Sequence, residues 1–321
     1  RQQANFTANV WTQTARNGVF RYFPGVLNGN ANAAVPVVDL TGNPVQPSNA
    51  TGPLQSQRVL GVDPNRLVAD PTGFVAKNLA LLPLPNNFRF GDGLNTAGYT
   101  WSRRAAENFN QWVLKIDHNW TANQRTSVAY SREKNDAENG FMPQRYPTAL
   151  GGSTTDQAST LSVRHVSTIS STTINEFTGG FQRPRVRFYS PWEIYGVDKV
   201  LPSNGAQPFL PLLASITNPI EDQDPQGRIS PVYSYGDSIT RFSGKHAMKA
   251  GAEVRWVSSN GFNSFTVIPR YAIGSGVLNN TAINNVPGIV ANNGVATNIL
   301  NDLTGTLTNI NQAFNAVDAK N

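Results

Sequence analysis

Apolar and polar residues alternate along residues 111–133 in two arms separated by a short polar turn at 121–124. In the first arm, every second position is apolar or aromatic, namely Trp112, Leu114, Ile116, His118 and Trp120. The second arm continues the pattern, with Val128 and Tyr130 on one parity and small or charged residues on the other. A period of two is typical of β-strands, so this stretch is predicted to form an antiparallel hairpin.

Two further stretches repeat this design. Residues 157–183 contain two strand-like arms around a Ser/Thr-rich connection, although their alternation is weaker. In residues 232–257 the alternation is clearest, because Met248, Val254 and Trp256 share one parity while Lys249 and Glu253 hold the other. The sequence therefore predicts three hairpins in one mainly β protein.

The segments between these hairpins are long and rich in Pro, Gly and Asn, whereas the turns within them are short. Connections in compact soluble domains usually have about 4 to 6 residues. Short turns at one end of the strands and long loops at the other are typical of an outer-membrane β-barrel. The predicted organisation within one barrel domain is an extracellular loop region with short helices (1–108), hairpins at 109–133, 157–183 and 232–257, long loops at 134–156 and 184–231, and a long loop at 258–321 with a helix near 298–315.

A strand that crosses a bilayer in a barrel has one face in lipid and one in water. The charged parity is predicted to face the lumen and holds Lys115, Asp117, Lys249, Glu253 and Arg255. Aromatic residues near the arm ends are predicted to lie at the lipid interface, namely Trp112, Trp120, Tyr130 and Trp256, together with Tyr233 and Tyr235. The alternative is a β-sandwich that buries the same apolar face against a second sheet.

Helix signals occur near both ends of the chain. Asp63-Pro64 and Asp70-Pro71 each place an N-cap residue before Pro, and the second pair is followed by apolar residues up to Leu82. Apolar residues recur at helical spacing at Ile299, Leu303, Leu307, Ile310 and Phe314. Both segments are predicted to be loop-packing helices.

Composition narrows the possible functions. Charged residues make up 14% of the chain, whereas Gly (27) and Pro (21) are frequent, which favours strands and ordered loops. The net charge is +6, but no run of basic residues is present to grip a phosphate backbone, so we expect no nucleic-acid partner. Without cysteine, a disulfide scaffold, a thiolate zinc site and a cysteine nucleophile are excluded. The first residue is Arg1 rather than Met, and we expect the chain to be a processed or truncated piece.

No motif for catalysis or cofactor binding stands out. The histidines His118, His165 and His246 belong to three different hairpins, so a shared metal site is not expected. The stretch 221–227 begins like a calcium loop but has Tyr233 where a bidentate Glu is needed, and is predicted to be a solvated acidic loop. Residues 91–96 lack the third glycine of a dinucleotide site and predict a turn. We expect no enzyme, no cofactor and no metal.

Several stretches resemble the barrel portion of TonB-dependent outer-membrane receptors, in particular the subgroup with an N-terminal carboxypeptidase-regulatory-like domain. These stretches are TARNGVFRYFPGV (14–26), DPTGFVAKNLALLPLPNNFRFGDGLNTAGYTW (70–101), KIDHNWTANQRTSVAYSRE (115–133), INEFTGGFQR (174–183), GKHAMKAGAEVRW (244–256) and ILNDLTGTLTNINQAFN (299–315). The most specific of them are the stretches at 115–133 and 244–256. The resemblance implies a large barrel closed by a plug domain, which binds a scarce nutrient and imports it with energy from the inner membrane.

If the resemblance holds, the partners are outer-membrane lipid, a TonB-type energy-coupling complex that acts through a plug domain not found in this chain, and a small-molecule, saccharide or peptide substrate. The chain is then expected to be an internal barrel fragment. Loops carry the binding residues of such receptors, and the candidate substrate contacts are Phe141, Arg145, Arg185, Phe188, Tyr189 and Trp192. The alternative function is a surface adhesin or carbohydrate-binding module, built as a β-sandwich and without transport.

Overall fold

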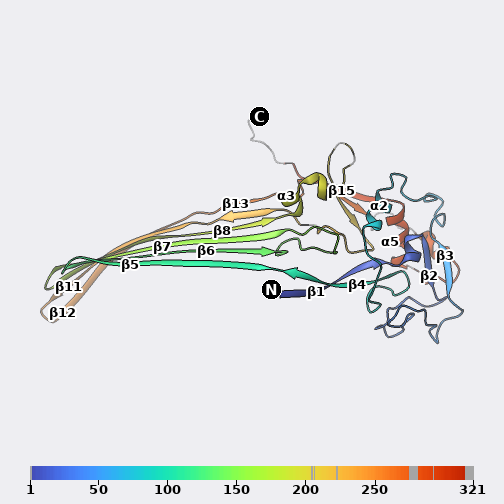
Figure 1. Cartoon of the computed structure of the whole chain (residues 1–321), viewed down its shortest axis with the longest axis horizontal. Helices are drawn as coiled ribbons and strands as arrows, with labels where there is room; N and C mark the ends of the chain where they lie inside the picture. The colour runs from blue at the N-terminus through green and yellow to red at the C-terminus, as the bar shows by residue number, and fades with distance from the viewer. Residues whose placement is uncertain are drawn as a thin grey trace.

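The computed structural model describes residues 2–203, 205, 207–221, 223–274, 281–291 and 293–314. Its main feature is an antiparallel sheet of six long strands that run side by side along the long axis of the molecule (Figure 1). In sheet order these are β5 (Glu107–Thr121), β6 (Gln124–Glu138), β7 (Ser153–Ser170), β8 (Thr173–Tyr189), β11 (Val232–Ser243) and β12 (His246–Val257). Two short strands, β10 (Gln226–Ile229) and β13 (Asn260–Asn263), pair with each other, and β10 also pairs with β8. Within the described part of the chain the sheet is open, because β5 and β12 each have one neighbour.

The two ends of the sheet differ in their connections. At one end β5 and β6, β7 and β8, and β11 and β12 are each joined by only two residues. Gly244 takes the first position of the last of these turns with a φ of 57°, a left-handed conformation that favours glycine in a two-residue hairpin turn. At the other end the connections are long, and they fold into a compact cap (Figure 1).

The strands are longer than the sequence pattern predicted. The hairpin expected over 109–133 spans 107–138, and the hairpin expected over 157–183 spans 153–189. The loops between the strands are correspondingly shorter at their edges, so that residues 139–152 make the first long connection. The pattern changes in the added segments because charged residues such as Lys134, Asp136, Arg185 and Arg187 replace apolar residues on the same face, which hides the continuation of the strands.

Residues 1–108 contain strands that the sequence analysis did not predict. β1 (Gln2–Trp11) pairs with β4 (Thr96–Ala105) in a two-stranded ribbon that continues directly into β5 (Figure 1). A second small pair joins β2 (Val19–Tyr22) to β3 (Gln55–Arg58). The expected loop region is therefore partly β, and the period of two is hidden because Val10 and Trp11, although adjacent, are both fully buried.

The cap contains the apolar core of the molecule. Its largest cluster brings Trp11, Phe20, Tyr146, Ile299 and Leu300 together from segments far apart in the sequence. The remaining cap elements are α1 (Gln13–Arg16), α2 (Phe74–Ala80), α3 (Pro191–Tyr195), α4 (Val197–Val200), β9 (Leu210–Leu213), β14 (Arg270–Ile273), the 3-10 helix η1 (Thr281–Asn285), α5 (Gly294–Leu303) and β15 (Leu307–Asn311). The long sheet contributes few residues to this core.

The helix predicted near 298–315 is only half correct. α5 ends at Leu303, and β15 follows it, so Leu307 and Ile310 lie in a strand. Gly305 has a φ of 64°, its N–H donates to Asp302 O at 3.2 Å, and Thr306 N–H donates to Asn301 O at 3.0 Å. These two bonds form a Schellman motif, which ends the helix. The last predicted residue position, 315, lies outside the described residues.

The two Asp-Pro pairs behave differently from the prediction. α2 begins at Phe74 rather than directly after Pro71, and the Asp70 carboxylate accepts the N–H of Val75 at 3.0 Å. Asp63 starts a turn instead of a helix, since Arg66 N–H donates to Asp63 O at 2.9 Å. Asp followed by Pro suits the first two positions of a type I turn as well as a helix start, which explains the error.

Candidate functional site

One face of the six-stranded sheet carries a layer of charged side chains. Strand register and pleat place on this face Lys115, Asp117, Arg125, Arg164, Glu176, Lys249, Glu253 and Arg255. Four ion pairs form among these residues: Arg125 with Asp117 at 3.3 Å, Lys115 with Asp117 at 3.9 Å, Arg164 with Glu176 at 2.9 Å, and Arg255 with Glu253 at 2.8 Å. Exposed pairs of this kind add little stability. They instead identify the face that is compatible with water.

The five residues predicted to line the lumen all lie on this polar face, and their lumen-facing role stays a prediction. Near the short turns the same face contains a groove of about 640 Å³. Asp117 lines this groove, accepts the Ser127 hydroxyl at 2.5 Å and lies 3.9 Å from the Lys115 ammonium. Carboxylate, ammonium, guanidinium and hydroxyl groups together form a surface suited to hydrated polar solutes.

The opposite face of the sheet is mainly apolar and is uncovered, although Asp237 of β11 lies on it and accepts the Asn175 amide at 2.8 Å. Val254 is 65% exposed and Trp256 is 70% exposed. The predicted interfacial aromatics also lie here, with the Trp112 and Tyr130 rings 5.3 Å apart and Trp120 donating from Nε1 to Thr126. Within the residues that the structure describes, no second sheet covers this face, so they do not form the β-sandwich that was the alternative prediction.

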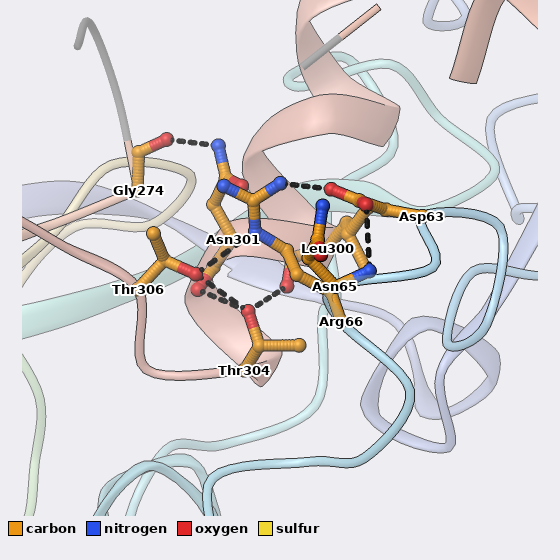
Figure 2. Close-up of polar contacts among 8 residues, drawn as sticks. All are labelled: Asp63, Asn65, Arg66, Gly274, Leu300, Asn301, Thr304 and Thr306. Carbon is orange, nitrogen blue, oxygen red and sulfur yellow. Dashed lines mark hydrogen bonds and ion pairs between the residues drawn. The ribbon is translucent and has the colours of Figure 1, made fainter. Parts of the chain in front are cut away.

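The cap is tied together by polar contacts as well as by its core. Figure 2 shows one such network at the C-terminal end of α5. The Arg66 guanidinium pairs with the Asp63 carboxylate and donates from Nε to the Thr306 hydroxyl at 3.1 Å, while Asn301 Nδ2 donates to Gly274 O at 2.6 Å. Residues 63–66, α5 and the end of β14 are thereby fixed to one another.

Arg16 forms a second fixed point of the cap. Its guanidinium donates to the carbonyls of Leu79 at 3.1 Å, Leu82 at 2.9 Å and Pro83 at 2.5 Å, which are at or just beyond the C-terminal end of α2. A cation at this position satisfies free carbonyls and the negative end of the helix dipole. Burial lowers the pKa of Arg16. A cavity of about 360 Å³ lies beside it, lined by Asp70, Leu79 and other residues of both segments.

The six predicted substrate contacts do not converge on one site. Phe141 and Trp192 are buried in an apolar cluster against which Phe188 packs, and the rings of Phe141 and Phe188 are 5.1 Å apart. These three side chains pack loop residues against the sheet, and their role as substrate contacts stays a prediction. The signal that sequence reasoning missed is the capping box of α3, in which Ser190 and Glu193 bond reciprocally around Pro191.

The other three predicted contacts have separate surroundings. Arg145 pairs with Glu221 and lies over the Phe6 ring, with its guanidinium carbon 5.6 Å from the ring centre. Tyr189 is half-buried beneath the Arg187 guanidinium at 5.2 Å. Arg185 is exposed on the same side of the sheet as the apolar face. Any role of these residues in substrate binding stays a prediction.

The acidic stretch 221–227 is less solvated than predicted. Asp224 is buried, pairs with Arg270 at 2.7 Å, and accepts the Thr266 N–H at 3.0 Å. Asp222 lies outside the described residues. Among the residues that the structure does describe, no group of three His, Cys, Asp or Glu side chains is placed to hold a metal ion.

Residues 91–96 form the expected turn. Gly93 N–H donates to Thr96 O at 2.9 Å, and the Asp92 carboxylate accepts the N–H groups of Asn95 and Thr96. The N–H groups of Asp92, Gly93, Asn95 and Thr96 therefore all bond within the turn.

Comparison with known proteins identifies the family. A family model described as an outer membrane beta barrel domain matches residues 1–321. No curated protein and no solved structure matches the chain. In the described parts of the chain, no helix is long and apolar enough to cross a membrane. The open antiparallel sheet, with one apolar and one charged face, agrees with the family match, and the chain belongs to the outer membrane beta barrel domain family and resides in the outer membrane.

Proposed function

We propose that the chain is part of a TonB-dependent receptor, of the subgroup with an N-terminal carboxypeptidase-regulatory-like domain, which imports a scarce nutrient across the outer membrane. The stretches at 115–133 and 244–256 support this assignment, because they resemble the same receptors and fall on β5, β6 and β12. Substrate would be a small molecule, a saccharide or a peptide, and energy would reach the receptor through a plug domain.

The observation that carries the proposal is the combination of a charged sheet face with a folded cap at one end. A strand needs about 9 to 11 residues to span a bilayer in a barrel. β5 and β6 have 15 residues each, β7 has 18 and β8 has 17. The additional residues extend these strands beyond the bilayer, where the strands support long loops that three apolar clusters hold in place.

This arrangement favours uptake over adhesion. An adhesin needs an exposed binding surface but no wet interior, whereas here charged residues lie on the polar face of β5, β6, β7, β8 and β12, and β11 adds Ser234, Ser238 and Thr240 to it. In the closed barrel this face would line the interior as Lys115, Asp117, Lys249, Glu253 and Arg255. A polar solute held by the cap would therefore meet a polar path through the membrane.

The test is genetic and uses nutrient growth as its readout. Strains that lack either the gene or the TonB-type energy-coupling complex are compared on a panel of saccharides, peptides and iron chelates as limiting nutrients. The proposal predicts that both strains lose growth on the same nutrient, and that the wild-type gene restores it in the first strain. Growth lost only in the gene deletion would indicate passive diffusion, and lost surface adherence with normal growth on every nutrient would indicate an adhesin.

A further inference from the structure

The apolar face of the sheet ends in a line of basic side chains on the side of the cap. Strand register places Arg132 of β6 beside Ser159 of β7, and Ser159 beside Arg183 of β8. Two residues nearer the short turns, the same three strands carry Tyr130, Leu161 and Phe181. Because the pleat points residues i and i+2 to the same side, the arginines share the face of the apolar residues.

The next row toward the cap continues the basic character. Lys134, Gln157 and Arg185 are partners in register on the same three strands and the same face. We define the basic patch as Arg132, Lys134, Arg183 and Arg185. All four side chains are exposed.

Most of this charge lacks a carboxylate partner. Lys134 pairs with Asp136 at 2.6 Å, and the adjacent Arg187 pairs with Glu193 at 2.5 Å. Arg132, Arg183 and Arg185 form no ion pair with any residue that the structure describes. Three unpaired guanidinium groups on one surface indicate an anionic ligand from outside the chain.

The spacing suits phosphate. Adjacent strands lie about 4.8 Å apart, so the backbones of β6 and β8 are roughly 10 Å apart across β7. Guanidinium groups from both strands can approach the space above Ser159 and bind phosphate oxygens in bidentate fashion. The hydroxyl of Ser159 and the amide of Gln157 lie between them as further hydrogen-bond donors.

The height of the patch identifies the source of the phosphate. Trp112, a predicted interfacial residue, is the register partner of Arg132 and so lies level with it. The patch therefore lies at the boundary between hydrocarbon and headgroups, on the side of the long loops. Long loops of outer-membrane barrels are extracellular, so this boundary belongs to the outer leaflet.

We propose that the basic patch binds the phosphate groups of a phosphorylated lipid in the outer leaflet. The acyl chains of this lipid lie against Tyr130, Leu161 and Phe181, and its phosphates contact Arg132 and Arg183 across Ser159, with Arg185 and Lys134 above. The site is on the outside of the barrel and is separate from any substrate path through its interior. It fixes the height of the strands in the membrane.

The test measures lipid retention by native mass spectrometry of the full-length protein in phosphatidylcholine nanodiscs that contain a bis-phosphorylated lipid A. An Arg132→Gln/Arg183→Gln variant removes two patch charges. Its matched control, Arg241→Gln/Lys245→Gln, removes two charges from the opposite, short-turn end of β11 and β12. Each basic residue near a membrane surface raises the affinity for an anionic lipid about fivefold. Because the patch variant lacks two of them, it should bind the lipid on the order of 10- to 30-fold more weakly than wild type.

Further controls test whether the charge of the patch, the folding of each variant or the source of the phosphate accounts for a difference in lipid binding. An Arg132→Lys/Arg183→Lys variant keeps the charge and should retain most of the binding, and heat-modifiable migration in detergent checks that every variant is folded. Lipid A without phosphates should bind wild type as weakly as it binds the patch variant. Equal lipid retention by wild type and the patch variant would overturn the proposal, as would equal retention of the dephosphorylated lipid. Displacement of the lipid by inorganic phosphate at matched concentration would assign the site to free phosphate and also overturn it.

Discussion

Asp302 in α5 is expected to control how the stability of the cap depends on pH. Its carboxylate is fully buried and accepts the N–H groups of Ala214 at 3.1 Å and Ser215 at 3.0 Å, together with the Ser215 hydroxyl. That hydroxyl in turn accepts Trp11 Nε1–H at 2.8 Å. Burial raises the pKa of Asp302 to about 6, because loss of hydration outweighs the hydrogen bonds, which lower it.

A carboxyl with a higher pKa in the folded cap than in the opened chain binds its proton more tightly when folded. The stability contributed by the neutral form is complete below about pH 4, is lost as the pH rises to about 6, and stays lost above it. A difference of about two pKa units corresponds to about 3 kcal/mol. Relative to an Asp302→Asn variant, which cannot titrate, the wild-type cap should therefore lose about 2–3 kcal/mol of opening free energy between pH 4 and pH 7.

Hydrogen–deuterium exchange of α5 amides measures this opening free energy after correction for the intrinsic exchange rates. The reference is the difference between wild type and Asp302→Asn at each pH, since other titrating groups are common to both. Exchange in β7 serves as an internal control, because it is remote from Asp302. A wild-type to variant difference that is constant from pH 4 to pH 7, or that grows in favour of wild type as the pH rises, would refute the reasoning.

Three further substitutions test individual parts of the structure. Val254→Arg, on the apolar face, should reduce the unfolding free energy of the membrane-inserted protein by about 2–4 kcal/mol. The control is Val113→Arg on the charged face, at a valine that is exposed to the same degree (64% against 65%), and it should change this free energy by less than about 1 kcal/mol. Unfolding titrations in lipid vesicles compare the two variants. Arg16→Met should cost about 2 kcal/mol of local stability at α2 by leaving carbonyls unpaired, with only partial rescue by Arg16→Lys, and unchanged exchange at α2 would contradict this. Ser190→Ala should remove the capping box and cost about 1 kcal/mol, seen as faster exchange in α3 but not in α5.

The sheet was predictable because its signal is local. In β5 and β12 the residues that share a face are two apart in the sequence, so strand, face and turn could all be read from the alternation. The same reading could have found the basic patch, since Arg132 follows Val128 and Tyr130 on one parity, and Arg183 follows Phe181. The pattern was lost only beyond the apolar rows, where charged residues such as Lys134 and Arg185 take the positions that are apolar nearer the short turns.

The cap was not predictable because its contacts are distant in sequence. Asp302 bonds to Ser215, which is 87 positions away, and no spacing rule links the two. Trp11 and Phe20 pack against α5 from the other end of the chain. Aromatic side chains in loops can serve packing or substrate binding, so the sequence did not show that Phe141 and Trp192 are buried in an apolar cluster.

The central claim is that one sheet face contacts lipid while the other contacts water. The chain has no cysteine, so single cysteines can be introduced without further changes. Spin labels are attached at Val254→Cys and at Glu253→Cys, two adjacent positions in β12 that point to opposite faces. In lipid nanodiscs, the collision rate of each label is measured with oxygen, which concentrates in lipid, and with a water-soluble nickel complex. The account predicts preferential oxygen contact at position 254 and preferential nickel contact at position 253. Protection of position 254 from both reagents, as in a dry protein core, or equal nickel contact at both positions, would contradict it.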